Sequence, residues 1–235
     1  MNLISLCLIV IILIMILEGI HRGFLRSALN LGVFFLSVIT SYLFYPVVST
    51  AVKANKSIFD YLIYYTEGAE KITTYESSQL LVDNLSKSQL DSILTSSNTS
   101  EPFTSLIRQN VEAKAFASDG LTTIGEYFNM TIVSAVLNIL SFLAVFLLAR
   151  IIFAFVLGSI DYTVQFPELR QYDRTTGALF GALHGFLVCF LIVIVIPIVL
   201  LILPVDKISE YFQTSNIGMF FFNNNFFLHL IRGVI

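Results

Sequence analysis

Few side chains in this sequence are of the types that carry out chemistry, and those few are far apart. The three histidines are widely spaced from one another, and so are the two cysteines, Cys7 and Cys189. A zinc site needs a tighter cluster of ligands, and cysteines inside apolar runs behave as small hydrophobic residues. The sequence also lacks a phosphate-binding loop, a His-Glu-x-x-His signature and a Gly-x-Ser-x-Gly elbow. We therefore expect no metal, no cofactor and no enzymatic activity.

The composition identifies the elements that must position the remaining polar residues. Hydrophobic residues make up 56% of the 235 residues and charged residues 12%, which is about half the charged share of soluble domains. A soluble domain of this length could not bury so much apolar surface. The net charge of −3 gives no reason to expect a nucleic-acid partner. The sequence thus predicts an all-α, polytopic membrane protein whose first partner is the lipid bilayer.

Four stretches are apolar enough to cross the hydrocarbon core, which takes about 20 residues. They are residues 3–17, extending to Ile20 if Glu18 lies at the interface, and residues 28–48, 130–157 and 178–203. Backbone polar groups in lipid must be satisfied within the segment, so each should be a transmembrane helix. Acidic residues outnumber basic ones in the long polar region between the second and third spans. Its apolar residues recur at helical spacing, which predicts a helical extramembrane insertion.

These features divide the chain into four predicted parts. Residues 1–49 form a helical hairpin, residues 50–129 a helical cap, residues 130–204 a second hairpin and residues 205–235 an amphipathic, aromatic tail along the membrane interface. The alternative for the tail is a fifth span, although polar residues interrupt each of its apolar runs. The first span lacks the basic start and the small-residue cleavage site of a signal peptide, so we expect it to be retained.

Arginines in the two short links predict the orientation. Arg22 and Arg26 lie between the first two spans, and Arg170 and Arg174 between the last two. Short loops rich in lysine and arginine stay in the cytoplasm. We therefore expect both short links inside the cell, and residues 50–129 and both termini outside.

The fourth span contains the most regular pattern. Gly177, Gly181 and Gly185 recur every four residues, so they share one helix face and permit close approach of another backbone. That face either packs within the chain, or forms an oligomer or lines a pore. His184 is either a packing residue or a ligand or proton relay. Pro197 removes a backbone donor and should kink the span, as a gate hinge or only as a matter of shape.

Charged residues lie near the ends of the predicted spans. Glu18 and Arg22 are four residues apart, a spacing at which opposite charges meet on a helix. Arg150 lies inside the end of the third span, and an ionisable group there is a functional candidate. Alternatively, its side chain extends to the headgroups or pairs with Asp161 or Asp173.

Two stretches together resemble a known family. The turn Glu18-Gly-Ile-His-Arg-Gly-Phe-Leu-Arg26 resembles the Gly-x-x-Arg-Gly-Phe signature of the colicin V production protein (CvpA) family. The stretch Asp173-Arg-Thr-Thr-Gly-Ala-Leu-Phe-Gly-Ala-Leu-His-Gly185 is similar to that family's Asp-Arg-x-x-Gly-x-x-x-Gly-x-x-x-Gly block. Their order and the four-helix plan also match, over roughly residues 1–205. The family positions carried over are Gly19, Arg22, Gly23, Phe24, Asp173, Arg174, Gly177, Gly181 and Gly185.

The resemblance implies a non-enzymatic protein of the bacterial plasma (inner) membrane. It implies a role in producing or secreting a peptide toxin and in maintaining the cell envelope, with secretion or envelope proteins as further partners. We expect a homo-oligomer. The alternative function is a small oligomeric channel in which the glycine face of the last span lines the pore.

Overall fold

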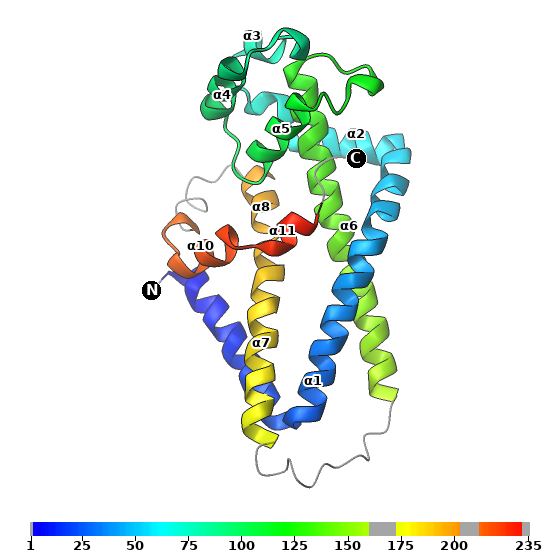
Figure 1. The fold of residues 1–235 in the computed structure, drawn as a ribbon, viewed down its shortest axis with the longest axis vertical. Helices are drawn as coiled ribbons and strands as arrows, with labels where there is room; N and C mark the ends of the chain where they lie inside the picture. The colour runs from blue at the N-terminus through cyan, green and yellow to red at the C-terminus, as the bar shows by residue number, and fades with distance from the viewer. Residues whose placement is uncertain (1, 160–172, 203–211, 232–235) are drawn as a thin grey trace. The chain divides into compact units, whose positions relative to one another are not determined.

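The computed structural model describes residues 2–159, 173–202 and 212–231 (Figure 1). In these residues the structure is helical throughout, apart from turns, loops and one isolated antiparallel bridge between Leu81 and Thr123. The predicted all-α class is therefore confirmed. The chain divides into two compact units. Unit 1 comprises Met1–Tyr45, Phe142–Ile196 and Val205–Leu230, and unit 2 comprises Pro46–Ser141, Pro197–Pro204 and Ile231–Ile235.

The first helix, α1 (Leu3–Ala54), is 52 residues long and is interrupted at Gly23. The backbone angles of Gly23 are φ 74° and ψ 179°, which are not helical. A glycine reaches such a positive φ without the steric conflict that a Cβ would create. We call residues 3–22 the first limb and residues 24–54 the second limb; Figure 1 shows the limbs diverging from the turn. These limbs correspond to the first two predicted spans.

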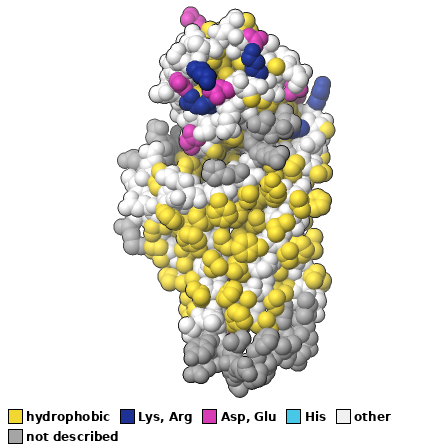
Figure 2. Space-filling view, viewed as in Figure 1, with side chains coloured by type: hydrophobic (Ala, Val, Ile, Leu, Met, Phe, Trp, Pro, Cys, Tyr) yellow, Lys and Arg dark blue, Asp and Glu magenta, His cyan; other side chains and the backbone are white. Residues whose placement is uncertain are grey.

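Three helices in the described part of the chain are long and apolar enough to cross a membrane. They are α1, α6 (Ile124–Ser159), and α7 (Asp173–Val193) together with the helix that follows it, α8 (Ile196–Ile202). Large apolar side chains are exposed along them, and Figure 2 shows hydrophobic side chains covering their visible surface. The chain is thus a multi-pass membrane protein.

The fourth predicted span is interrupted at Ile194 and Val195, between α7 and α8. Pro197 has no N–H to donate to the carbonyl of Val193, and its ring crowds that carbonyl. Helix α7 accordingly ends at Val193, four residues before the proline. The interruption lies where the sequence predicts a kink.

Aromatic rings and a serine hydroxyl connect the three long helices within unit 1. Phe34 of α1 is buried, and its ring centroid lies 5.3 Å from that of Phe146 in α6 and 5.4 Å from that of His184 in α7. Both ring pairs have the edge-to-face geometry that aromatic quadrupoles favour. Ser41 of α1 donates a hydrogen bond to the backbone carbonyl of Phe142 in α6. Interhelical hydrogen bonds of this kind hold helices together in lipid.

The described part of the tail folds onto α7. It forms α10 (Asn216–Asn223) and α11 (Phe226–Leu230), of 8 and 5 residues. Phe221 is buried, with its ring centroid 5.0 Å from that of Phe186 and 4.8 Å from that of Phe190. Neither helix reaches the length of a span. The interfacial placement of the tail stays a prediction.

Unit 2 contains a group of short helices around a small apolar core. Its core side chains Phe103, Ile107, Phe116, Ile124 and Phe128 are fully buried. Exposed ion pairs join Asp91 to Arg108 and Asp83 to Lys114. The hydrogen bond that the Lys114 ammonium donates to the Asp83 carboxylate raises the pKa of Lys114. Figure 2 shows such charged side chains gathered over this group. The helices are α2 (Lys56–Thr66), α3 (Tyr75–Ser78), α4 (Lys87–Ser96) and α5 (Phe103–Glu112).

Candidate functional site

The turn of α1 and the start of α7 are in direct contact, which brings the two sequence motifs together. Asp173 Oδ1 accepts a hydrogen bond from the backbone N–H of Phe24, with 2.8 Å between nitrogen and oxygen. Phe24 is the first residue of the second limb. The N–H groups at a helix start lack partners within the helix, and the helix dipole favours a negative charge there. The Asp173 carboxylate therefore caps the second limb of α1 from a different helix.

Gly23 makes this close approach possible. A Cβ built on Gly23 would lie 2.2 Å from Oδ2 of Asp173, and the positive φ of Gly23 is unfavourable for residues with a side chain. The next residue, Phe24, packs edge-to-face against Phe180 of α7, with 5.3 Å between ring centroids. The contact of Gly23 with α7 thus depends on its lack of a side chain, and that of Phe24 depends on its aromatic ring.

The glycine stripe of α7 faces the first limb of α1 in the same chain. A Cβ built on Gly177 would lie 2.3 Å from the carbonyl oxygen of Gly19, and one built on Gly181 would lie 2.2 Å from that of Met15. A Cβ built on Gly185 would lie farther away, 3.0 Å from the Cα of Ile12. Lacking side chains, these glycines let the two backbones approach closely. The sequence left open whether this face packs within the chain, forms an oligomer or lines a pore. In the structure it packs against the first limb of α1 in the same chain.

A small cavity with both polar and apolar lining residues lies beside the glycines, between the limbs of α1 and α7. It measures about 10 Å³, close to the room that one water molecule needs. Glu18 and Arg22 form an ion pair at its edge, with 2.6 Å between Oε1 and Nη2. The lining residues are Met15, Glu18, Gly19, Arg22, Ser27, Asn30, Phe180, Gly181 and His184.

Arg150 of α6 binds Asn30 in the second limb of α1. Its Nη1 donates to the backbone carbonyl of Asn30 at 3.2 Å, and its Nη2 donates to the side-chain Oδ1 at 2.5 Å. Asp173, one of the two carboxylates considered as a partner for Arg150, binds the backbone N–H of Phe24. The other predicted partner, Asp161, lies outside the described residues. Sequence reasoning missed Asn30, although an asparagine inside an apolar run was a signal for it.

The other predicted site residues have simpler surroundings. His184 is buried, packs against Phe34 and lines the cavity. Among the described residues, no group of three or more His, Cys, Asp or Glu side chains could hold a metal ion. Arg26 and Arg174 are exposed.

Asn225 is a buried polar residue that the sequence analysis did not single out. Its Nδ2 donates to the carbonyl of Phe190 at 2.8 Å, and its Oδ1 accepts from the backbone N–H of Phe227 at 3.1 Å. The Phe190 carbonyl is one of the last four of α7, which lack intrahelical partners at a helix end. Asn225 thus supplies a hydrogen-bond donor to the Phe190 carbonyl, which the interruption of the helix before Pro197 leaves without an intrahelical partner. The run of three asparagines between phenylalanines was the available signal.

A comparison with known protein families gives a match. The family model described as colicin V production protein matches residues 92–224, more than half of the chain. The matched segment contains α6, α7 and the block from Asp173 to Gly185, whereas the turn from Glu18 to Arg26 lies outside it. No curated protein and no solved structure matches the chain.

Proposed function

Since the chain belongs to the colicin V production protein family, we propose that it supports the production or secretion of a peptide toxin and the maintenance of the cell envelope. In this proposal it is a non-enzymatic protein of the bacterial plasma membrane. The observation that carries the proposal is the joint between Asp173 and the turn at Gly23 and Phe24. At this joint Asp173 caps a helix, Gly23 leaves room for the Asp173 carboxylate, and Phe24 packs its ring against Phe180. These are the contacts of a scaffold and not of a catalytic site.

The proposal includes four spans, with the limbs of α1 counted separately. In the second limb, residues 27–52 contain no formally charged side chain. At 1.5 Å per residue this stretch is about 39 Å long, which matches a bilayer with its headgroup layers. The first limb has no charged side chain before Glu18. The turn at Gly23 then lies in the cytoplasm, and residues 50–129 and both termini lie outside.

A homo-oligomer is part of the proposal, but the glycine stripe does not supply its interface. That stripe is covered by the first limb of α1. Helix α7 exposes a different apolar face, on which Leu179, Leu183 and Phe186 follow at spacings of four and three residues. We place the contact with a second copy, or with a secretion or envelope protein, on this face.

Complementation of a deletion strain tests the function. Wild type, Asp173→Ala and Leu148→Ala are expressed to equal membrane levels, and secreted toxin activity and survival in detergent are measured. Leu148 is exposed on α6, so Leu148→Ala should restore both phenotypes as wild type does, whereas Asp173→Ala should not. If the deletion strain itself exports toxin and survives detergent like its parent, the proposed function is refuted.

Cysteine labelling tests the orientation. Lys87→Cys and His21→Cys, at two exposed positions, are made in a background in which Cys7 and Cys189 are alanine. A membrane-impermeant thiol reagent should label Lys87→Cys in intact cells and His21→Cys only after permeabilisation. The reverse pattern would show that the orientation is inverted.

A further inference from the structure

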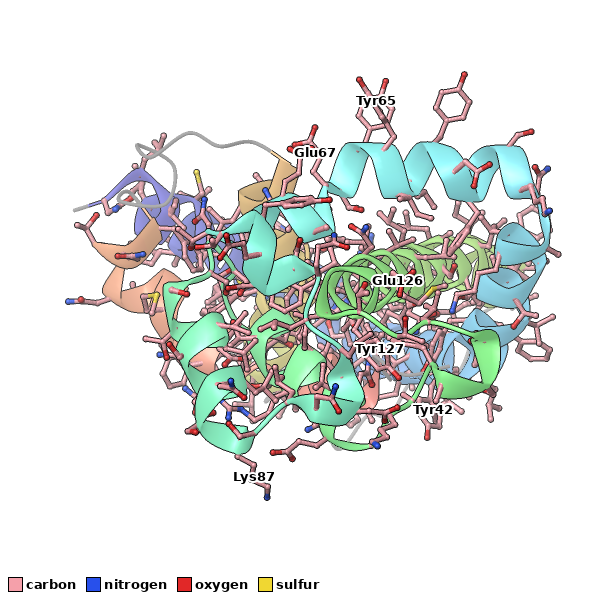
Figure 3. The ribbon with its side chains drawn as sticks, turned by 90° about the horizontal axis from the view of Figure 1, so that it is seen from above. Tyr42, Tyr65, Glu67, Lys87, Glu126 and Tyr127 are labelled. Atoms are coloured by element: carbon pink, nitrogen blue, oxygen red, sulfur yellow. The ribbon has the colours of Figure 1, made fainter. Side chains whose placement is uncertain are left out.

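Helix α2 has an exposed aromatic face. The exposed fractions of its large side chains are 47% for Ile58, 65% for Tyr61, 70% for Tyr64 and 62% for Tyr65. Ile58, Tyr61 and Tyr65 are spaced i, i+3 and i+7, so they share one side of the helix. Figure 3 shows Tyr65 pointing away from α6. We call these four residues the tyrosine face.

The opposite side of α2 fixes the direction of the tyrosine face. Phe59 and Ile63 are half-buried and Thr66 is buried, so this side packs against the rest of unit 2. Asn55 caps the helix start, where its side-chain oxygen accepts from the backbone N–H of Ile58. The helix therefore cannot turn its tyrosines inward without giving up this packing.

The position of α2 in the chain places it at a membrane surface. It begins at Lys56, two residues after α1 ends, and just beyond the uncharged stretch that matches the bilayer thickness. Lys53 and Lys56 flank the junction, and lysine ammonium groups near span ends extend toward the headgroups. In Figure 3, which views α6 end-on, α2 lies across the view. A helix in this place and direction runs along the bilayer surface, not through it.

We propose that the tyrosine face of α2 lies in the headgroup layer of the bilayer and binds phospholipid. Tyrosine combines an apolar ring with a hydroxyl that needs a polar partner, and it is enriched at both membrane–water interfaces. Helices that lie along a membrane surface bury one side at the boundary between headgroups and acyl chains. Helix α2 thereby anchors residues 50–129 to the membrane. The inference requires that α1 spans the membrane, and it is independent of the role in toxin secretion.

Tryptophan fluorescence tests this proposal, because the chain contains no tryptophan. Tyr64→Trp in the full chain gives a single reporter on the tyrosine face. The protein is reconstituted into phosphatidylcholine–phosphatidylglycerol vesicles whose acyl chains are brominated either near the headgroups or near the bilayer centre. The matched control is Tyr75→Trp in α3, where the side chain is 78% exposed. We expect headgroup-proximal bromines to quench most of the Tyr64→Trp emission and little of the Tyr75→Trp emission.

Three outcomes would overturn the proposal. Quenching of Tyr64→Trp as weak as that of Tyr75→Trp, with red-shifted emission, would place the face in water. Stronger quenching by the deep bromines would place it in the hydrocarbon core. Blue-shifted emission without quenching would show that protein, such as a second copy of the chain, covers it. Tyr65→Trp repeats the measurement at a second position, should Tyr64→Trp fail to fold.

Discussion

The carboxylate of Asp173 caps a helix to which it does not belong, with its Oδ1 2.8 Å from the backbone nitrogen of Phe24. The two residues are 149 positions apart. Two short motifs that are far apart in the sequence therefore form a single joint. At that joint the turn of α1 is fixed to the start of α7. A substitution in either motif should therefore destabilise the packing of both helices.

Replacement of Asp173 tests the cap. Asp173→Ala should lower the free energy of unfolding by about 1–2 kcal/mol, the usual cost of losing an N-cap acceptor. Asp173→Asn should cost less, because its amide oxygen can still accept from Phe24. Reversible unfolding in mixed micelles measures both. Equal stability of wild type and Asp173→Ala would show that the hydrogen bond contributes nothing.

Gly181→Leu should weaken the packing of α7 on the first limb of α1 within each chain. Since a Cβ alone would lie 2.2 Å from the Met15 carbonyl oxygen, a leucine side chain must push the helices apart. We expect a lower unfolding temperature and faster proteolysis, while membrane insertion stays intact because leucine favours the bilayer. Leu148→Ala, at an exposed position on α6, is the control. A Gly181→Leu protein as stable as the Leu148→Ala protein would disprove the packing.

The contact between Arg150 and Asn30 should behave as a fork of two hydrogen bonds. Arg150→Lys should be nearly as destabilising as Arg150→Gln, because lysine cannot present two donors in one plane. A double-mutant cycle with Asn30→Ala should give a coupling free energy of about 1–3 kcal/mol, as for hydrogen bonds to charged groups. Additive effects of Arg150→Gln and Asn30→Ala would contradict the contact.

Asn225→Ala should destabilise the protein by about 1–3 kcal/mol, because it leaves the buried Phe190 carbonyl without its partner. The loss should be smaller in a Pro197→Ala background, where the restored N–H lets α7 continue and Ile194 supply a donor. Thermal unfolding of the two single variants and the double variant measures this coupling. An equal loss of stability in both backgrounds would show that the contribution of Asn225 does not depend on the interruption of the helix.

The sequence by itself determined the class of protein and its long helices. Apolar length and low charge are local properties, and in lipid each backbone must satisfy its own hydrogen bonds. The ion pair of Glu18 with Arg22 and the interruption near Pro197 were predictable for the same reason, since both depend on residues within one helical turn or so.

Only the tertiary structure decided which surfaces meet. A stripe of glycines allows another backbone to approach closely but does not specify which one. The sequence therefore left Gly181 compatible with a second subunit. In the structure its neighbour is the backbone of Met15 in the same chain. Asn30 and Asn225 were polar residues in apolar runs, and their partners Arg150 and Phe190 lie far away in the sequence. The helical hairpin around Gly23 was predictable because it depends on neighbouring residues. The carboxylate that caps its second limb comes from Asp173, far away in the sequence. A helix start requires an acceptor but does not specify where in the chain that acceptor must lie.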